Sequence, residues 1–265
     1  MAVRPPDKDE LGALARGYGM ALSDADLETY TLLVGGSFSS YDAVEELYAE
    51  LAPKTSAARE ATRPEDADNP LGAWYVRTDI QGADHGPLAG RTLAVKDNIE
   101  VAGVPMMNGS HTLEGFVPSR DATVVSRLLE AGASVAGKAV CEDLCFSGGS
   151  HTSVTGPVRN PWDPTRTTGG SSSGSAALVA SGQVDLALGG DQGGSIRMPS
   201  AFCGIVGHKP THGLVPYTGA FPIELTLDHL GPMTRTCADA AAMLDPIAGP
   251  DGPDPRQPPG PAPEQ

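Results

Sequence analysis

Two loops rich in glycine and serine constrain the fold of this chain most strongly. The first has the sequence GGSSSGS at residues 169–175, and the second has GGDQGGSIR at residues 189–197. Glycine allows close backbone approach, and a helix predicted over 176–181 turns its N-terminus toward the first loop. A flexible linker is a weaker interpretation, because apolar structured sequence lies on both sides. The pattern therefore predicts a site lined by backbone N–H groups.

Short apolar runs alternate with helical patterns from Trp74 onward. We predict strands at Thr92–Val95, Ser134–Ala139 and Asp185–Leu188. An amphipathic helix is predicted at Thr123–Ala131. Such alternation is typical of an α/β domain whose sheet is mostly internal.

The chain is expected to have three parts. Residues 1–70 form a helical region, in which Ser23 is a suitable N-cap, followed by a polar linker that begins at residue 52. Residues 71–248 form the α/β domain. Residues 249–265 are rich in proline, which breaks helices and strands, so this segment is predicted to be a disordered tail.

Composition excludes several classes of function. Apolar residues make up 40% of the chain, which is enough for a core, and the net charge of −15 leaves no basic footprint for nucleic acid. No apolar run is long enough to span a membrane, and the first residues do not resemble a signal peptide. We therefore predict a cytoplasmic enzyme that needs no metal or cofactor. The cysteines, expected to be reduced, match no zinc spacing; they are Cys141, Cys145, Cys203 and Cys237.

Lys96 is the lysine best placed to serve the two loops as a base. It directly follows the predicted strand residues Leu93–Val95 and precedes Asp97. Burial favours the neutral amine of a lysine, and a neutral amine is a usable proton acceptor near neutral pH. The alternative is that Lys96 is an exposed loop lysine paired with Asp97, which is the more common arrangement. The position of Lys96 in the sequence does not decide between a base and this alternative.

Two serines in the loops are candidate nucleophiles. Ser172 is the centre of a formal G-x-S-x-G pattern, but the residues before it do not read as the strand that an α/β-hydrolase elbow requires. Ser195 follows two glycines, which suits an oxyanion hole as well as an ordinary turn. Asp191 and Arg197 flank it with opposite charges and are expected to pair. A Ser–His–Asp triad stays open, whereas Cys203 is expected to be buried and inert.

Taken together, these segments resemble the amidase signature family over nearly the whole chain. The resemblance is carried by residues 169–216, from GGSSSGSAALVASGQVDLALGGDQGGSIRMPSAFCG to the segment ending in GLVP, and by AVKDNIEVAGVPMMNGS at residues 94–110. The segment PYTGAFP at residues 216–222 is similar to bacterial amidases that act alongside nitrile hydratases. The implied fold is a mixed central sheet flanked by helices, and a homodimer is the implied assembly.

The resemblance implies a role for each residue of a catalytic triad. Ser195 corresponds to the nucleophile, Ser171 to a relay serine at a cis peptide bond, and Lys96 to the base. The implied reaction is hydrolysis of a small carboxylic acid amide to carboxylate and ammonia through an acyl-enzyme. Supporting roles are implied for Ser172 and Asp191. The implied oxyanion hole comprises the N–H groups of Gln192, Gly193, Gly194 and Ser195.

The acyl pocket and the extent of the chain are less constrained. Phe146 and Leu227 are candidates for an apolar acyl wall. Family chains run considerably further than residue 265, so we expect the C-terminal part of the sheet and pocket to be absent and this chain to be a fragment or a truncated product. Two other functions stay open. One is an A-type amidotransferase chain, which usually has Thr where this chain has Gln192, and the other is a catalytically silent fragment.

Overall fold

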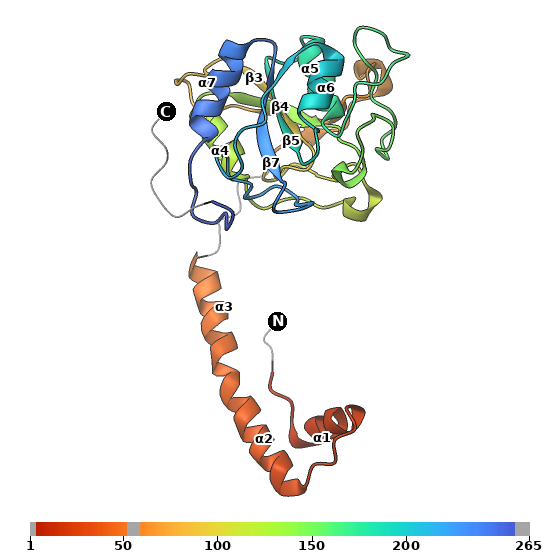
Figure 1. Ribbon diagram of the computed structural model, residues 1–265. Coiled ribbons are helices and arrows are strands. Elements are labelled where there is room, and N and C mark those ends of the chain that lie inside the picture. Colours follow the sequence, from red (N-terminus) through yellow and green to blue (C-terminus); the bar gives the residue numbers. More distant parts are fainter. Residues whose placement is uncertain (1–3, 52–58, 258–265) are drawn as a thin grey trace. The chain divides into compact units, whose positions relative to one another are not determined.

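The structure, a computed structural model, describes residues 4–51 and 59–257. The chain divides into two compact units, residues 1–54 and 55–265, and Figure 1 shows the elements of each. The boundary falls at residue 54 rather than 70, because the expected linker contributes strand β1 (Ala61–Thr62) to the sheet of the second unit, where it pairs with β2 (Trp74–Ile80).

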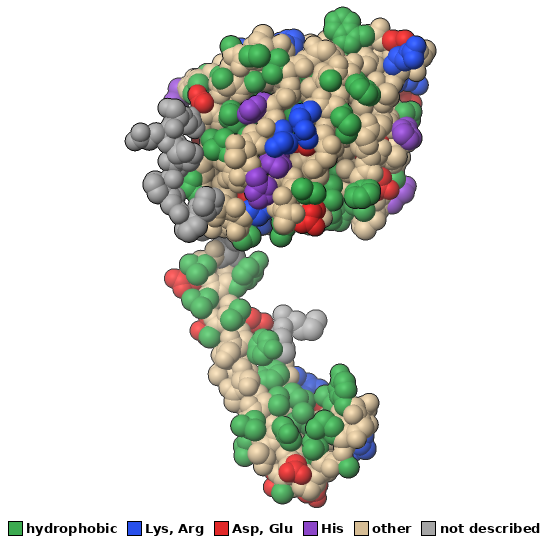
Figure 2. Space-filling view, viewed as in Figure 1, with side chains coloured by type: hydrophobic (Ala, Val, Ile, Leu, Met, Phe, Trp, Pro, Cys, Tyr) green, Lys and Arg blue, Asp and Glu red, His purple; other side chains and the backbone are tan. Residues whose placement is uncertain are grey.

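The first unit consists of helices whose start signals are readable in the sequence. They are α1 (Lys8–Gly17), α2 (Asp24–Ser37) and α3 (Ser39–Leu51). Asp7 and Ser23 each form a capping box, in which the side chain three residues later returns a hydrogen bond to the backbone of the cap. Neither α2 nor α3 contains a buried residue, and Figure 2 shows apolar side chains along these helices. No helix in the described ranges is long and apolar enough to cross a membrane.

The second unit is built on a mixed seven-stranded sheet with the order β1-β2-β4-β3-β5-β7-β6. The centre is parallel, because β3 runs parallel to both β4 and β5, and the outer pairs are antiparallel. The predicted α/β class is therefore confirmed. The remaining strands are β3 (Thr92–Lys96), β4 (Ser134–Ala139), β5 (Leu186–Asp191), β6 (Val206–Gly207) and β7 (His229–Thr234).

Helices pack on the central strands of this sheet (Figure 1). Helix α5 (Ser173–Ala180) packs on β3 and β5, and it is buried on every side from Ser173 to Val179. Helix α7 (Cys237–Ile247) packs on β7 and on α4 (Thr123–Glu130). Helix α5 begins with serines, and their burial requires hydrogen-bond partners for the serine hydroxyls. The other helical segments are α6 (Arg197–Cys203), η1 (Asp66–Asp68), η2 (His111–Leu113) and η3 (Asp143–Cys145).

The prediction of a disordered tail is wrong for its first part, residues 249–257. Asp254 is buried, accepts a hydrogen bond from the N–H of Tyr217 at 2.8 Å and pairs with Arg256 at 2.6 Å. The guanidinium of Arg127 donates to the carbonyls of residues 247–250. Proline prevents regular elements here but leaves carbonyls and side chains free to make these contacts. Residues 258–265 lie outside the described residues.

Candidate active site

The two glycine-serine loops meet where the central parallel strands end. Lys96 is the last residue of β3 and Asp191 is the last residue of β5, and these strands are adjacent and parallel. The carboxyl ends of parallel strands lie at the same edge of a sheet, which is where open α/β sheets place their sites. The loop at 169–172 leads into α5, which packs on the same two strands.

Lys96 is fully buried and points at a serine of the first loop. Its Nζ donates to Ser171 Oγ at 2.8 Å and to the carbonyl of Gly190 at 3.2 Å. Among the described residues Lys96 forms no ion pair. The alternative of an exposed lysine paired with Asp97 is wrong, because the carboxylate of Asp97 pairs with Lys138.

Ser171 contacts Lys96 and belongs to the loop that is bonded to the loop of Ser195. The peptide bond between Gly170 and Ser171 is cis, as the resemblance implied, and the Ser171 side chain is fully buried. The N–H of the next residue, Ser172, donates to the carbonyl of Ser195 at 3.3 Å. This bond holds the first loop against the second, so Ser171 and Ser195 lie in adjoining loops, and their catalytic roles stay a prediction.

Ser195 borders a pocket of about 260 Å³ and is 6% exposed. Phe146 is 81% exposed and contributes to the pocket wall, and its contact with an acyl group stays a prediction. Leu227 does not line the pocket; the apolar positions there are taken by Met198 and Ile223. The remaining lining residues are Cys145, Ser147, Gly148, Gln192 and Gly193.

The buried carboxylate of Asp191 organises the second loop. It accepts hydrogen bonds from the N–H groups of Gly194 and Ile196 at 2.8 and 3.0 Å, and Arg197 binds both of its oxygens. The predicted pairing of Asp191 with Arg197 is therefore confirmed. Burial opposes ionisation of Asp191, but the bonds from Arg197 and the backbone outweigh burial and lower its pKa.

One implied oxyanion donor needs correction. The N–H of Gly194 is already used by the Asp191 carboxylate, so it is not free to bind an oxyanion in this structure. Among the described residues, the N–H groups of Gln192, Gly193 and Ser195 have no hydrogen-bond acceptor. The three residues line the pocket, and the role of their N–H groups as an oxyanion hole stays a prediction.

Ser172 anchors the first loop on β5. Its Oγ donates to the carbonyl of Gly190 at 3.2 Å and accepts from the N–H of the same residue at 3.3 Å. No strand leads directly into it, so the α/β-hydrolase elbow is not formed. The two bonds to Gly190 attach the first loop to β5, and the supporting role of Ser172 stays a prediction.

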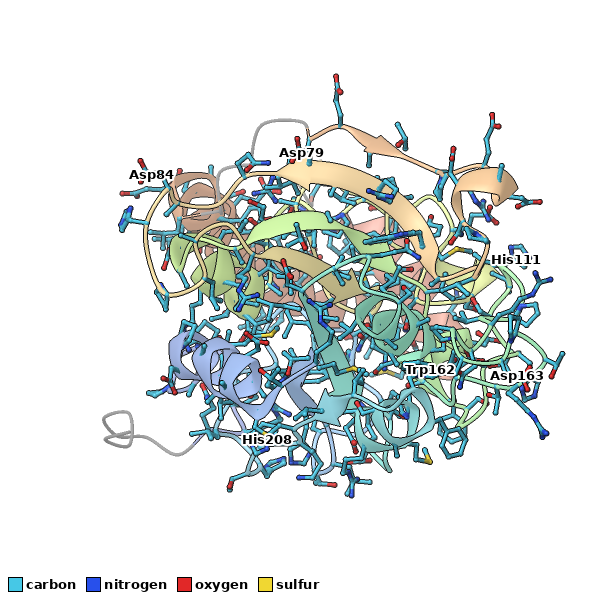
Figure 3. All side chains as sticks on the ribbon, turned by 90° about the horizontal axis from the view of Figure 1, so that it is seen from above. Asp79, Asp84, His111, Trp162, Asp163 and His208 are labelled. Carbon is cyan, nitrogen blue, oxygen red and sulfur yellow. The ribbon has the colours of Figure 1, made fainter. Side chains whose placement is uncertain are left out.

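None of the six histidines, all of which are described, hydrogen-bonds to Ser195 or Ser171, and none lines the pocket. Figure 3 shows His111 and His208 toward the rim of the second unit. His111 is bonded to Glu114 and His229 to Lys209. A Ser–His–Asp triad is therefore not assembled in the described residues.

A buried ion pair beside the site was missed by the sequence analysis. Lys138 Nζ donates to Asp97 Oδ1 at 2.9 Å, while Asp97 Oδ2 accepts from the N–H groups of Met107 and Asn108 at 3.0 and 2.9 Å. Burial raises the pKa of Asp97, and the charge of Lys138 opposes this rise. The signal was a second lysine inside a predicted apolar strand, where a buried charge requires a partner.

Hydrogen bonds to Tyr217 and Asp228 fix the side chain of Gln192, and the sequence did not predict them. The hydroxyl of Tyr217 accepts from Gln192 Nε2 at 3.0 Å and from Asn98 Nδ2 at 3.3 Å, and it donates to the carbonyl of Phe221. Gln192 Nε2 also donates to the buried carboxylate of Asp228 at 2.8 Å. These groups come from distant loops, so no local sequence pattern could have joined them.

Comparison with known proteins places this site in a family. The family profile described as Amidase matches residues 44–265. The chain is 58% identical over 258 residues to an enantioselective amidase of Rhodococcus rhodochrous, which covers 97% of this chain and 49% of that protein. Among solved structures, the A-type chain of the glutamyl-tRNA(Gln) amidotransferase from Thermotoga maritima superposes with a TM-score of 0.69 at 41% identity, over 72% of this chain and 42% of that one.

The native peptide amidase of Stenotrophomonas maltophilia is also similar, with a TM-score of 0.62 and 44% identity over 64% of this chain and 36% of that one. The chain thus spans about half the length of the curated relatives that it matches. The profile match extends over most of the chain and includes both loops and Lys96. The chain therefore belongs to the amidase signature family.

Proposed function

We propose that this chain carries the catalytic machinery of a serine amidohydrolase, which cleaves carboxylic acid amides to carboxylate and ammonia. The observation that carries the proposal is the 2.8 Å contact between the fully buried Lys96 Nζ and Ser171 Oγ, in a loop that is bonded to the loop of Ser195. A nucleophile, a proton relay and an amine in sequence are the parts that an acyl-transfer reaction requires.

Burial supports Lys96 as a neutral base. A charged amine in a buried site needs a counter-ion, and the nearest candidate carboxylate in sequence, Asp97, is bonded to Lys138. The partners of Lys96 are instead a hydroxyl and a carbonyl. In the neutral form, the lone pair of Nζ accepts the proton of Ser171 across the same contact.

The proposed reaction proceeds in two halves. Ser195 Oγ attacks the amide carbonyl as its proton passes to Ser171 and that of Ser171 passes to Lys96. The tetrahedral oxyanion is bound by the free N–H groups of Gln192, Gly193 and Ser195, which lie beside the pocket. The relay then returns a proton to the departing ammonia, and water hydrolyses the acyl-enzyme by the reverse path.

The pocket favours an apolar acyl group. Phe146, Met198 and Ile223 contribute apolar surface, and no charged side chain is among its lining residues. We therefore propose small aliphatic or aromatic primary amides as substrates. An amidotransferase A-type role is the second candidate, supported by the structural similarity to a chain of that kind; Gln192 in place of its usual Thr argues against it.

Covalent labelling with a fluorophosphonate probe tests the proposal. We expect a single label on Ser195, mapped by mass spectrometry, and ammonia release from a primary amide without any other protein. Lys96→Ala should slow labelling by about 10³-fold, within the range attributed to general bases. The matched control is Lys209→Ala, because Lys209 binds His229 and the carbonyl of Pro210 outside this site.

Three results would contradict parts of the proposal. A label on Ser172 would replace the assigned nucleophile, and unchanged labelling of Lys96→Ala would remove the assigned base. A labelled Ser195 that releases ammonia only when an ammonia acceptor is supplied would favour the amidotransferase. Folded protein with no label at all would favour a silent chain.

A further inference from the structure

Glu142 is a buried acidic residue to which the proposed reaction gives no role. It lies between β4 and η3 and is fully buried. Its Oε1 accepts from Ser173 Oγ at 2.8 Å, and its Oε2 accepts from the N–H and from Oγ1 of Thr152, both at 2.7 Å. Among the described residues Glu142 forms no salt bridge. Its buried carboxyl group is therefore satisfied by hydroxyl and backbone donors rather than by a cation.

Glu142 contacts the first glycine-serine loop at two points. Its N–H donates to the carbonyl of Ser171 at 3.2 Å, and Ser171 is the residue whose hydroxyl accepts from Lys96. Its carboxyl group binds Ser173, which is the first residue of α5 and lies two positions further along the same loop. Both bonds act on the short stretch of chain that sets the position of the Ser171 hydroxyl.

The remaining bonds of Glu142 attach a wall of the pocket to this loop. Thr152 belongs to the segment 147–152, and Gly148 of that segment lines the pocket. The carbonyl of Gly148 accepts from the N–H of Gly170 at 2.9 Å, so the segment also packs on the first loop directly. A side-chain carbon added at Gly170 would lie 2.8 Å from Glu142 Cγ, which only glycine avoids. Glu142 therefore lies where the first loop meets the pocket wall.

We propose that Glu142 is a positioning residue for the proton relay, which fixes Ser171 against the pocket wall so that its hydroxyl stays in contact with Lys96. The effect on the reaction rests on the proposed function, whereas the hydrogen bonds of Glu142 do not. A misplacement of about 1 Å in a reacting geometry can lower a rate by about 10²-fold. Loss of the Glu142 bonds should therefore slow the reaction more than it weakens substrate binding.

Two serines of α5 provide a matched test. Ser173→Ala removes the bond to Glu142, whereas Ser175→Ala removes a bond from Ser175 Oγ to the carbonyl of Leu188 at 3.1 Å. Both serines are fully buried, and urea denaturation establishes that the rates compare folded proteins. We expect Ser173→Ala to slow fluorophosphonate labelling of Ser195 by about tenfold or more, and Ser175→Ala by less than about twofold. In hydrolysis of a primary amide, the loss should appear in kcat, with KM changed by less than about threefold.

Substitution of Glu142 itself separates positioning from charge. Gln has the same length, its oxygen can accept from Thr152, and its amide can donate to Ser173 Oγ. Glu142→Gln should therefore keep the labelling rate within about threefold, whereas Glu142→Leu, which offers neither group, should lower it by about 100-fold. If Glu142→Leu does not fold, the Ser173 and Ser175 variants still decide the proposal.

Hydrogen exchange follows the first loop without any reaction. The N–H groups of Glu142 and Gly170, which bond to the carbonyls of Ser171 and Gly148, should exchange faster in Ser173→Ala and unchanged in Ser175→Ala. Equal labelling rates in the two serine variants, or a loss confined to KM, would overturn the positioning role. Faster exchange in Ser173→Ala of a chain whose Ser195 is never labelled would keep Glu142 as the residue that fixes the loop and overturn only the proposed function.

Discussion

The ends of β3 and β4 each bury a lysine, but in opposite electrostatic settings. Lys138 lies opposite Val95 and Lys96 lies opposite Ala139, so the two lysines occupy successive register positions and point to opposite faces of the sheet. Lys138 donates to a buried carboxylate, whereas Lys96 donates to a hydroxyl and a carbonyl. Both side chains are fully buried, so the difference lies in the partner and not in access to water.

This difference separates an amine held in an ion pair from the amine that we propose as the base. Lys138 forms a buried ion pair with Asp97, and removing either partner would leave a buried charge uncompensated. Lys96 has no such partner among the described residues, so its neutral form is compatible with burial. Because Asp97 is occupied by Lys138, the residue next to the proposed base is prevented from pairing with it. The ion pair therefore fixes Asp97 beside the proposed base and has no role in the proposed reaction.

The largest effect on stability is expected from Lys138→Met. It leaves the Asp97 carboxylate buried without its counter-ion, so the free energy of unfolding should fall by about 3–5 kcal/mol. Lys96→Met removes hydrogen bonds but leaves no charge behind, and should cost less than about 1.5 kcal/mol. Urea denaturation of both variants measures the difference.

A double variant sharpens this test. Asp97→Asn combined with Lys138→Met removes both charges and keeps one amide oxygen to accept from the backbone of Met107 or Asn108. It should recover a large part of the stability lost by Lys138→Met alone. If Lys138→Met and Lys96→Met lowered the free energy of unfolding equally, the ion pair would not be what distinguishes Lys138 from Lys96.

A smaller effect is expected from Tyr217→Phe. This variant tests whether hydrogen bonds between uncharged side chains position the loop that contains Gln192. The substitution removes the acceptor shared by Gln192 and Asn98, and it leaves the part-buried Gln192 donor with Asp228 alone. We expect a loss of about 1–3 kcal/mol in unfolding free energy and a fall of about tenfold in the rate of Ser195 labelling. Tyr75→Phe is the control, because Tyr75 lies on β2, away from the pocket.

The sequence predicted local elements of the second unit, whereas the triad implied by the resemblance stays a prediction. Ser134–Ala139 has the bounds of β4, and the predicted strand at Thr92–Val95 is one residue shorter than β3. Helix α5 begins at Ser173 rather than Ala176, because the serine hydroxyls bond to Glu142 and to the carbonyl of Leu188 and so can be buried inside a helix. Those partners lie outside the helix, and no periodicity in its own sequence could have indicated them.

Long-range polar partners are what the sequence did not predict. The site depends on which carboxylate pairs with which cation, and the sequence order suggested Lys96 with Asp97 while the sheet register joins Asp97 to Lys138. The same reason applies to residues 249–257, whose prolines predicted disorder although Asp254 is buried beside Arg256. By contrast, Asp191 and Arg197 are six residues apart, and their pairing was predictable because it forms within one loop.

The smallest effect is expected from Arg197→Met in that loop. Arg197 is 52% exposed, and Asp191 keeps its bonds from the N–H groups of Gly194 and Ile196, so the loss near neutral pH should be below about 1 kcal/mol. The pKa of Asp191 is lowered below its ordinary 3.8 in the folded chain. Its stabilising contribution is therefore complete above that value and is lost as the pH falls through the lowered pKa.

Removing Arg197 should return the folded-state pKa of Asp191 toward the ordinary value. As the pH falls, the N–H groups of Gly194 and Ile196 should therefore lose their protection from hydrogen exchange at a higher pH than in the unmodified chain. Hydrogen exchange at Gly194 and Ile196 between about pH 3 and pH 5 measures this shift. Arg166→Met is the control, since Arg166 pairs with Asp163 on an exposed loop. An acid transition of the loop that does not move in Arg197→Met would mean that the backbone N–H groups alone keep Asp191 ionised. Asp191 would then resemble Asp97 in accepting from the backbone, but its cation would be dispensable, unlike Lys138.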